Sequence, residues 1–225
     1  MHTLLLWDID ATLIVSGGAG ERALVTALQR HAGLTGNLEG VELAGRTDPL
    51  IARHFLAKYG QPSTPADVAR FLTHYLAALP GELPHPQARV LPGVRELLAD
   101  LATRPGIAQG LLTGNSRRGA ELKLTHHGLW HHFPFGAFSD DSETRNDLGP
   151  HALRRAQAHH GVPFAPDRVY VIGDTPHDIA CGQAIGARTI GVATGHFTTA
   201  NLAAHGATHV FADFSDAKAF LRAIQ

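Results

Sequence analysis

Near its start the chain reads Leu4-Leu5-Leu6-Trp7-Asp8-Ile9-Asp10-Ala11-Thr12-Leu13. The apolar run predicts a buried β-strand, and Asp8 and Asp10 stand one residue apart where that run ends. Because a strand alternates its side chains and a turn after it can splay them, the two carboxylates can take different roles around one reacting atom. We therefore expect the chemical centre of the protein at this strand end.

Composition limits the class of protein. The chain has 225 residues, of which 44% are hydrophobic and 17% charged, enough for one large globular domain or a core domain with a smaller insert. A net charge of -1 gives no general attraction to nucleic acid or anionic lipid. The apolar start is short and has no basic leader, and no stretch approaches the roughly 20 apolar residues of a membrane helix. The single cysteine, Cys181, excludes an intramolecular disulfide. We expect a cytoplasmic protein, a monomer or small homo-oligomer, without nucleic-acid or membrane partners.

A helical pattern occupies the chain from about residue 20 to residue 79. One helix start is well marked, because Thr64 can cap, Pro65 suits the first helical position and Asp67 completes a capping box. Pro80-Gly81 is expected to end that helix. Gly- and Pro-containing stretches flank the pattern on both sides and return to the same place after the first strand. The sequence thus predicts an inserted helical domain, residues 16–87, within a core of residues 1–15 and 88–225.

After residue 93 strands and helices alternate. The expected strands cover residues 107–113, 135–138, 168–172, 188–192 and 208–211. Such alternation predicts an α/β fold, a Rossmann-like, mostly parallel sheet with helices on both faces. Ligands of such sheets bind beyond the carboxyl ends of the strands. Three polar segments fall at those ends and should converge there: Asp8 with Asp10, Thr113-Gly114-Asn115, and Gly173-Asp174-Thr175-Pro176-His177-Asp178.

The spacing of these segments resembles the haloacid dehalogenase-like (HAD) hydrolase superfamily, in its phosphoglycolate phosphatase-like branch with a small helical cap. Asp8-Ile9-Asp10-Ala11-Thr12 matches the family's first motif, and Thr113 matches its second. Gly173-Asp174 followed by Asp178 matches its fourth. The resemblance covers nearly the whole chain.

The residue types fit phosphoryl transfer on chemical grounds. A carboxylate can attack phosphorus and split a hydrolysis into two displacements, which makes Asp8 the candidate nucleophile. Asp10 would protonate the leaving alcohol and then accept a proton from water. Two carboxylates repel a phosphate dianion, so a divalent cation is required, and Mg²⁺ suits hard oxygen ligands. The resemblance implies that Asp8, the Asp10 carbonyl and Asp174 bind Mg²⁺ and that Asp178 supports them. We expect a Mg²⁺-dependent phosphomonoester hydrolase of a small phosphorylated metabolite.

Two further segments carry a functional and a purely structural interpretation. Thr113, with the N–H groups of Gly114 and Asn115 at a helix start, can bind a phosphoryl group, or the three residues can simply form a strand-to-helix turn. Asp178 can act at the metal site, and it also completes a capping box with Thr175.

The sequence departs from the family pattern in two places. Ala11 stands where related phosphatases often have Gly, so a positive φ there would be strained. The family's third motif usually has a Lys, and Arg145 occupies the matching place, so we assign Arg145 the charge-balancing role. Lys123 is the competitor, but its mid-helix position is interpreted as a solvated face. The acidic loop around Arg145 is also compatible with a solvated turn.

Substrate choice and reaction type stay open in part. Arg46 lies in a segment resembling the family's substrate-facing loop and could contact a second anionic group, although a helix start at Asp48 and Pro49 explains most of that segment. A phosphosugar mutase of the same family is an alternative. A dehalogenase has no need of Asp10, and a phospho-acceptor or binding module needs neither Asp10 nor a cap.

Overall fold

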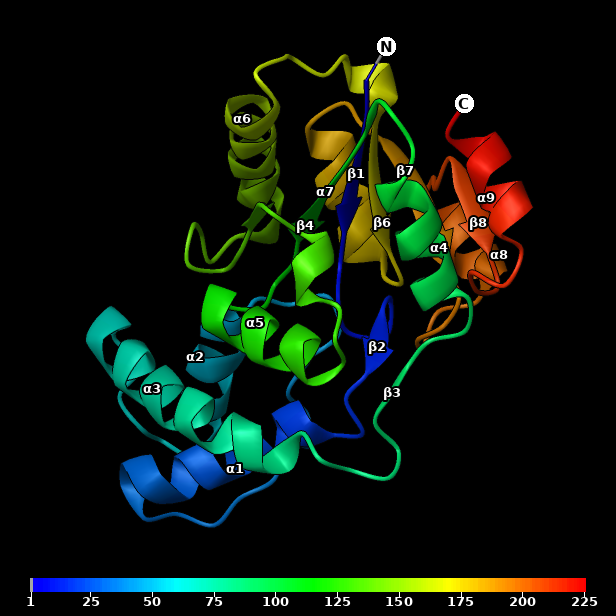
Figure 1. Ribbon diagram of the computed structural model, residues 1–225. Coiled ribbons are helices and arrows are strands. Elements are labelled where there is room, and N and C mark those ends of the chain that lie inside the picture. Colours follow the sequence, from blue (N-terminus) through cyan, green and yellow to red (C-terminus); the bar gives the residue numbers. More distant parts are fainter. Residues whose placement is uncertain (1) are drawn as a thin grey trace.

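The computed structural model describes residues 2–225. It consists of a six-stranded sheet with flanking helices and of a group of three helices beyond one end of the sheet (Figure 1). In chain order the elements are β1 Thr3–Trp7, β2 Ile14–Val15, α1 Ala19–Ala32, α2 Asp48–Lys58, α3 Pro65–Glu82, β3 Arg89–Val90, α4 Val94–Ala102, β4 Ile107–Leu112, α5 Arg117–His126, η1 Trp130–His132, β5 Gly136–Ala137, η2 Arg145–Asp147, α6 Leu148–His160, η3 Pro166–Arg168, β6 Val169–Gly173, α7 Pro176–Ala184, β7 Arg188–Val192, α8 Thr199–Ala204, β8 His209–Phe211 and α9 Ala217–Ala223.

The sheet has the strand order β5-β4-β1-β6-β7-β8, and every neighbouring pair is parallel. This confirms the predicted α/β fold. The strands β4, β1 and β6 are adjacent, and the three polar segments of the sequence follow these three strands. The chain runs from β1 outward through β4 to β5 and then crosses back to β6 on the other side of β1, so a crevice is expected beyond the carboxyl end of β1.

Alternation along β1 explains why both sheet faces are covered. Leu5 and Trp7 belong to a core cluster that includes residues of α4, α5 and α9. Leu4 and Leu6 belong to the cluster that includes residues of α6 and α7 on the opposite face. Since successive strand residues point to opposite faces, an uninterrupted apolar run requires helices on both sides.

The helices α1, α2 and α3 share a hydrophobic cluster of their own, built around Phe55, Phe71 and Leu28. We call these three helices with their connecting loops the helical module. Figure 1 shows the module beyond the carboxyl end of β1, joined to the sheet by segments containing β2 and β3, which pair with each other. The capping box of Thr64 and Asp67 starts α3 as predicted.

The predicted end of α3 at Pro80-Gly81 is wrong, because Pro80 lies inside the helix, which continues to Glu82. The following Leu83 is buried in the module's cluster, and Glu82 pairs with Arg22 of α1 at 2.8 Å. Packing of the last turn thus outweighs the hydrogen bond that proline cannot donate. No helix among residues 2–225 is both long and apolar enough to span a bilayer.

Candidate functional site

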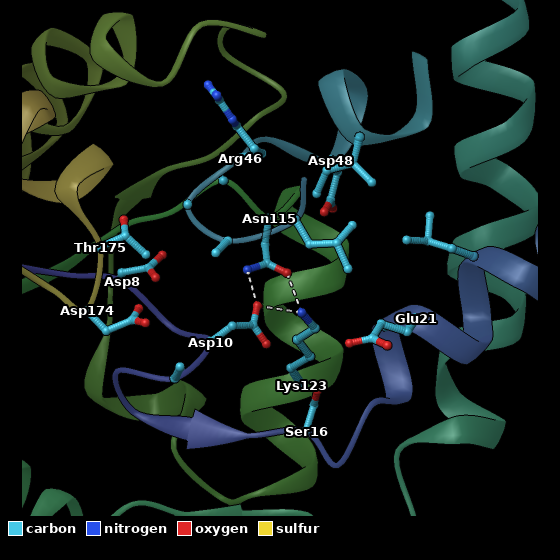
Figure 2. Close-up of a pocket in the computed structure, with 18 of the residues that line it drawn as sticks. Asp8, Asp10, Ser16, Glu21, Arg46, Asp48, Asn115, Lys123, Asp174 and Thr175 are labelled. Atoms are coloured by element: carbon cyan, nitrogen blue, oxygen red, sulfur yellow. Dashed lines mark hydrogen bonds and ion pairs between the residues drawn. The ribbon is translucent and has the colours of Figure 1, made fainter. Parts of the chain in front are cut away.

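The candidate site lies at the carboxyl ends of β1, β4 and β6, where a cavity of about 290 Å³ separates the sheet edge from the helical module. Its walls include Asp8 and Asp10 after β1, Asn115 after β4 and Asp174 after β6. The convergence predicted from the sequence is therefore present. Figure 2 shows these side chains directed toward one another from different elements.

Asp8 is buried, with 5% of its surface exposed. Its N–H donates to the Ile172 carbonyl at 2.9 Å, which continues the pairing of β1 with β6 and fixes where the carboxylate stands. Burial raises the pKa of Asp8 to about 6, against the lowering effect of the Arg145 guanidinium. Arg145 Nη2 lies 3.0 Å from Asp8 Oδ1.

Asp10 differs from Asp8 in its surroundings, because 42% of its side-chain surface is exposed. Its Oδ2 accepts hydrogen bonds from Lys123 Nζ at 2.6 Å and from Asn115 Nδ2 at 2.8 Å. Desolvation would raise its pKa, but the Lys123 charge and these two hydrogen bonds outweigh it, so the pKa of Asp10 lies below its ordinary value. The two aspartates thus have opposite pKa shifts although one residue separates them.

The turn between the two aspartates and β2 adopts the strained conformation anticipated at Ala11. Ala11 has a φ of 55°, the one positive φ of a non-glycine among residues 2–225. Its N–H donates to the Ile14 carbonyl at 2.8 Å, and its carbonyl accepts from Thr194 Oγ1 at 2.5 Å. These contacts hold the residue in a region that a Cβ disfavours.

The structure corrects the interpretation of Lys123. The sequence analysis placed it on a solvated helix face, but Lys123 is buried, with 4% of its surface exposed. Its ammonium bridges Asp10 and Asn115 Oδ1, the latter at 2.7 Å. Lys123 lies on the buried stripe of α5 together with Gly119, Ala120 and Leu124. The helical spacing of that stripe was the sequence signal that could have identified it.

Arg145 lies at the start of η2 and contacts the other aspartates of the site. Its Nη2 donates to Asp178 Oδ1 and lies beside Asp8, and its Nη1 donates to the Gly45 carbonyl at 3.0 Å. The side chain is 8% exposed, so the acidic loop around it is more than a solvated turn. Two cationic side chains therefore pair with the two aspartates: Arg145 with Asp8 and Lys123 with Asp10.

The segment after β6 combines a helix start with an acidic cluster. Thr175 and Asp178 form the predicted capping box of α7, in which Asp178 Oδ2 accepts from the Thr175 N–H at 3.0 Å. A Cβ at Gly173 would lie 2.1 Å from Asp178 Cγ, so glycine is needed to admit this carboxylate. Burial, with the charges of Asp178 and Asp8, raises the pKa of Asp174 to about 8.

The acidic cluster has the donor set of a divalent cation. One carboxylate oxygen each from Asp8, Asp174 and Asp178 lies within 4.8 Å of the others, and all three residues are buried. Hard carboxylate oxygens suit Mg²⁺, and crowding of three buried carboxylates is relieved by a cation. Because both oxygens of Asp178 already accept hydrogen bonds, Asp8 and Asp174 are the better direct ligands. The residues present fit such an ion.

The loop after β4 lies against the helical module. Thr113 is fully buried, and its Oγ1 accepts from the Asn115 N–H at 3.3 Å. A Cβ at Gly114 would lie 2.1 Å from the Arg46 carbonyl, so the close approach of the two segments requires glycine there. Asp48 at the start of α2 accepts from the Ser116 N–H at 2.7 Å, a bridge between module and core that the sequence did not indicate.

Arg46 lines the cavity, but its guanidinium points away from Asp8 and Asp10 (Figure 2). It pairs with Glu42 through Nη2 at 2.6 Å and Nε at 3.0 Å. The cavity also contains Ser16, Glu21 and Tyr75, which the sequence analysis did not identify.

Comparison with known proteins agrees with the fold. The model of the haloacid dehalogenase-like hydrolase family matches residues 5–183. A phosphoglycolate phosphatase from Rhodospirillum rubrum is 27% identical over 224 residues, covering 96% of this chain and 89% of the relative. A hydrolase from Pseudomonas syringae has a TM-score of 0.72 at 24% identity, with 99% of both chains covered. A predicted phosphoglycolate phosphatase from Haemophilus somnus has a TM-score of 0.75 at 18% identity, covering 100% of this chain and 98% of the other. The chain belongs to the haloacid dehalogenase-like hydrolase family.

Proposed function

We propose that the protein is a Mg²⁺-dependent phosphomonoester hydrolase that acts on a small phosphorylated metabolite through an aspartyl-phosphate on Asp8. The observation that carries the proposal is the opposite placement of the two aspartates. Asp8 is buried beside Arg145 and the acidic cluster, whereas Asp10 faces the cavity and is held by Lys123 and Asn115. Two carboxyl groups with separate duties are what a two-step phosphoryl transfer requires.

In the first step an oxygen of Asp8 forms a bond to phosphorus while the bond from phosphorus to the leaving oxygen breaks. Asp10 gives a proton to that oxygen, and it takes up this proton when the phosphate ester binds, because Lys123 and Asn115 keep the pKa of Asp10 low in the free protein. Lys123 and Asn115 both contact Oδ2 of Asp10, which leaves Oδ1 for proton transfer. In the second step water attacks phosphorus, Asp10 takes its proton, and the bond from Asp8 to phosphorus breaks.

The surrounding residues bind and orient the phosphoryl group in this proposal. Thr113 and the N–H groups of Gly114 and Asn115 precede α5 and would bind its oxygens. Arg145 balances the charge of Asp8 and Asp178. Bound Mg²⁺, held by Asp8, the Asp10 carbonyl and Asp174, would neutralise phosphate charge during the displacement.

We further propose that the helical module, within residues 16–87, is a cap over this site. Its support is the cavity shared between module and core and the contacts of Asp48 with Ser116 and of Arg53 with Glu143, the latter at 2.7 Å. The 27% identical relative named phosphoglycolate phosphatase supports a small phosphate ester as substrate.

The test is turnover of p-nitrophenyl phosphate with Mg²⁺ and with EDTA. We expect turnover only with Mg²⁺, its loss in Asp8→Asn, and its retention in the control Asp167→Asn, whose carboxylate is exposed. Acid quenching during turnover should trap phosphate on the wild-type protein and none on Asp8→Asn. Full activity of Asp8→Asn would refute the assignment.

A further inference from the structure

The part of the cavity beyond Asp10 receives whatever the phosphate is attached to. Its wall from the helical module and the preceding linker includes the apolar residues Leu24, Leu43 and Ile51 and the polar residues Ser16, Glu21, Arg46, Asp48 and Tyr75. The acidic groups of this wall are Glu21 and Asp48. Because the phosphate end of the substrate is held at the sheet edge, the side chains of this wall should determine which leaving group is accepted.

Each of the three lysine and arginine side chains that line the cavity already pairs with a carboxylate. Lys123 is paired with Asp10, Arg145 with Asp8 and Asp178, and Arg46 with Glu42. His196 also lines the cavity, but it follows Gly195, whose position lies against Asp174 on the core side. A second anionic group on the substrate would thus meet no free cation on the module's wall.

Glu21 is the carboxylate of that wall that accepts no hydrogen bond among residues 2–225, unlike Asp48. It lies in the first turn of α1, is exposed, and has no ion-pair partner among residues 2–225. Its neighbour Arg22 turns instead to Glu82, at 2.8 Å. In Figure 2 the Glu21 carboxylate points into the cavity toward Lys123, above Ser16.

The hydrogen-bonding groups of the wall match hydroxyl groups. The carboxylate of Glu21 only accepts, and the hydroxyls of Ser16 and Tyr75 both donate and accept. Within residues 2–225 the buried Tyr75 hydroxyl makes no hydrogen bond to protein, so it is free for a ligand. Glu21 would repel a substrate carboxylate at this wall, whereas a substrate hydroxyl would donate a hydrogen bond to it.

We propose that the substrate's leaving group is a small hydroxylated alcohol without a second anionic group, and that Glu21 selects against carboxylates such as that of phosphoglycolate. This proposal rests on the proposed phosphomonoesterase function. The chain would catalyse the same type of reaction as the Rhodospirillum rubrum relative named phosphoglycolate phosphatase, but on a different substrate.

The test compares two esters that differ in one group. In 2-phosphoglycolate a carboxylate stands where 2-hydroxyethyl phosphate has a CH₂OH group, and p-nitrophenyl phosphate reports whether any hydrolysis occurs. We expect kcat/KM for 2-hydroxyethyl phosphate to exceed that for 2-phosphoglycolate at least tenfold. Glu21→Gln should narrow the ratio at least threefold, Glu21→Lys should reverse it, and the exposed control Glu96→Gln should leave it unchanged.

The outcomes separate the two proposals. Turnover of p-nitrophenyl phosphate together with equal or greater activity on 2-phosphoglycolate would overturn the substrate class while leaving the phosphatase function intact. An unchanged ratio in both Glu21 variants would overturn the role of Glu21. Absence of turnover of all three esters with Mg²⁺ would overturn the phosphatase function itself, and the substrate class with it.

Discussion

The pairing of Lys123 with Asp10 leads to an asymmetric prediction about stability. The Lys123 side chain is 5% exposed and the Asp10 side chain 42% exposed, although Lys123 Nζ and Asp10 Oδ2 are only 2.6 Å apart. Asp10→Ala removes the partner of a buried charge and leaves Asn115 Oδ1 as its remaining contact. Removing one member of a buried ion pair costs about 3 to 5 kcal/mol, because the other charge stays buried without compensation.

The reverse substitution should cost less. In Lys123→Met the unbranched side chain fills most of the space of the lysine stem, and the Asp10 carboxylate keeps access to water. The loss is then that of charged hydrogen bonds, about 1 to 2 kcal/mol. The double variant removes the buried ammonium together with its partner, so we expect it to be more stable than Asp10→Ala alone by about 2 kcal/mol.

Urea unfolding, followed by far-ultraviolet circular dichroism with EDTA at pH 7.5, measures the free energy of unfolding of the wild type, the two single variants and the double variant. The reasoning fails if Asp10→Ala costs no more than Lys123→Met, or if the double variant is the least stable of the four. Changes within about 0.5 kcal/mol for both single variants are the behaviour of a solvated surface lysine, and they would contradict the burial of Lys123.

Three further predictions address other parts of the site. Arg145→Ala should lower kcat/KM for p-nitrophenyl phosphate more than Lys123→Ala, since Arg145 contacts Asp8 directly; steady-state kinetics showing the reverse order would transfer the larger role to Lys123. The raised pKa values of Asp174, about 8, and Asp8, about 6, mean that the folded metal-free protein binds more protons than the unfolded chain, so its stability should fall as pH rises from 6 to 8. Urea unfolding in EDTA should show this decline, and Asp174→Asn should flatten it. Gly173→Ala should destabilise the fold by several kcal/mol, because the added Cβ would lie 2.1 Å from Asp178 Cγ; an unchanged melting temperature would contradict that packing.

The fold could be predicted because its signals are local. Turn and cap chemistry marks helix starts independently of the rest of the chain, as at Thr64 and Thr175, whose capping boxes are both present. An apolar strand followed by two aspartates identifies β1 and its carboxyl end in the same way. Parallel alternation then places the ends of β4 and β6 beside it, which is why the acidic cluster was anticipated from residues far apart in sequence.

Features that depend on tertiary contacts were missed. Lys123 was misjudged because exposure is the usual state of lysine, and its partner Asp10 lies 113 residues away in the chain. Its inward position was encoded in the stripe of Ala120 and Leu124, but a charge on that stripe becomes plausible only once Asp10 is known to face it. Likewise, Glu21 and Tyr75 belong to helices whose stripes predict a core, and only the docking of the module places them in a cavity.

The substitution of arginine for the family's expected lysine has a geometric explanation in the structure. Arg145 serves Asp8 and Asp178 through one terminal nitrogen and the Gly45 carbonyl through the other. A lysine has one nitrogen, whereas a guanidinium presents donors in opposite directions from a rigid plane. Arg145 therefore connects Asp8, the acidic cluster and the loop that leads into α2. The Asp8 carboxylate is thereby connected to the helical module through Arg145, whereas the hydrogen bonds to Asp10 come from Lys123 and Asn115 of the core.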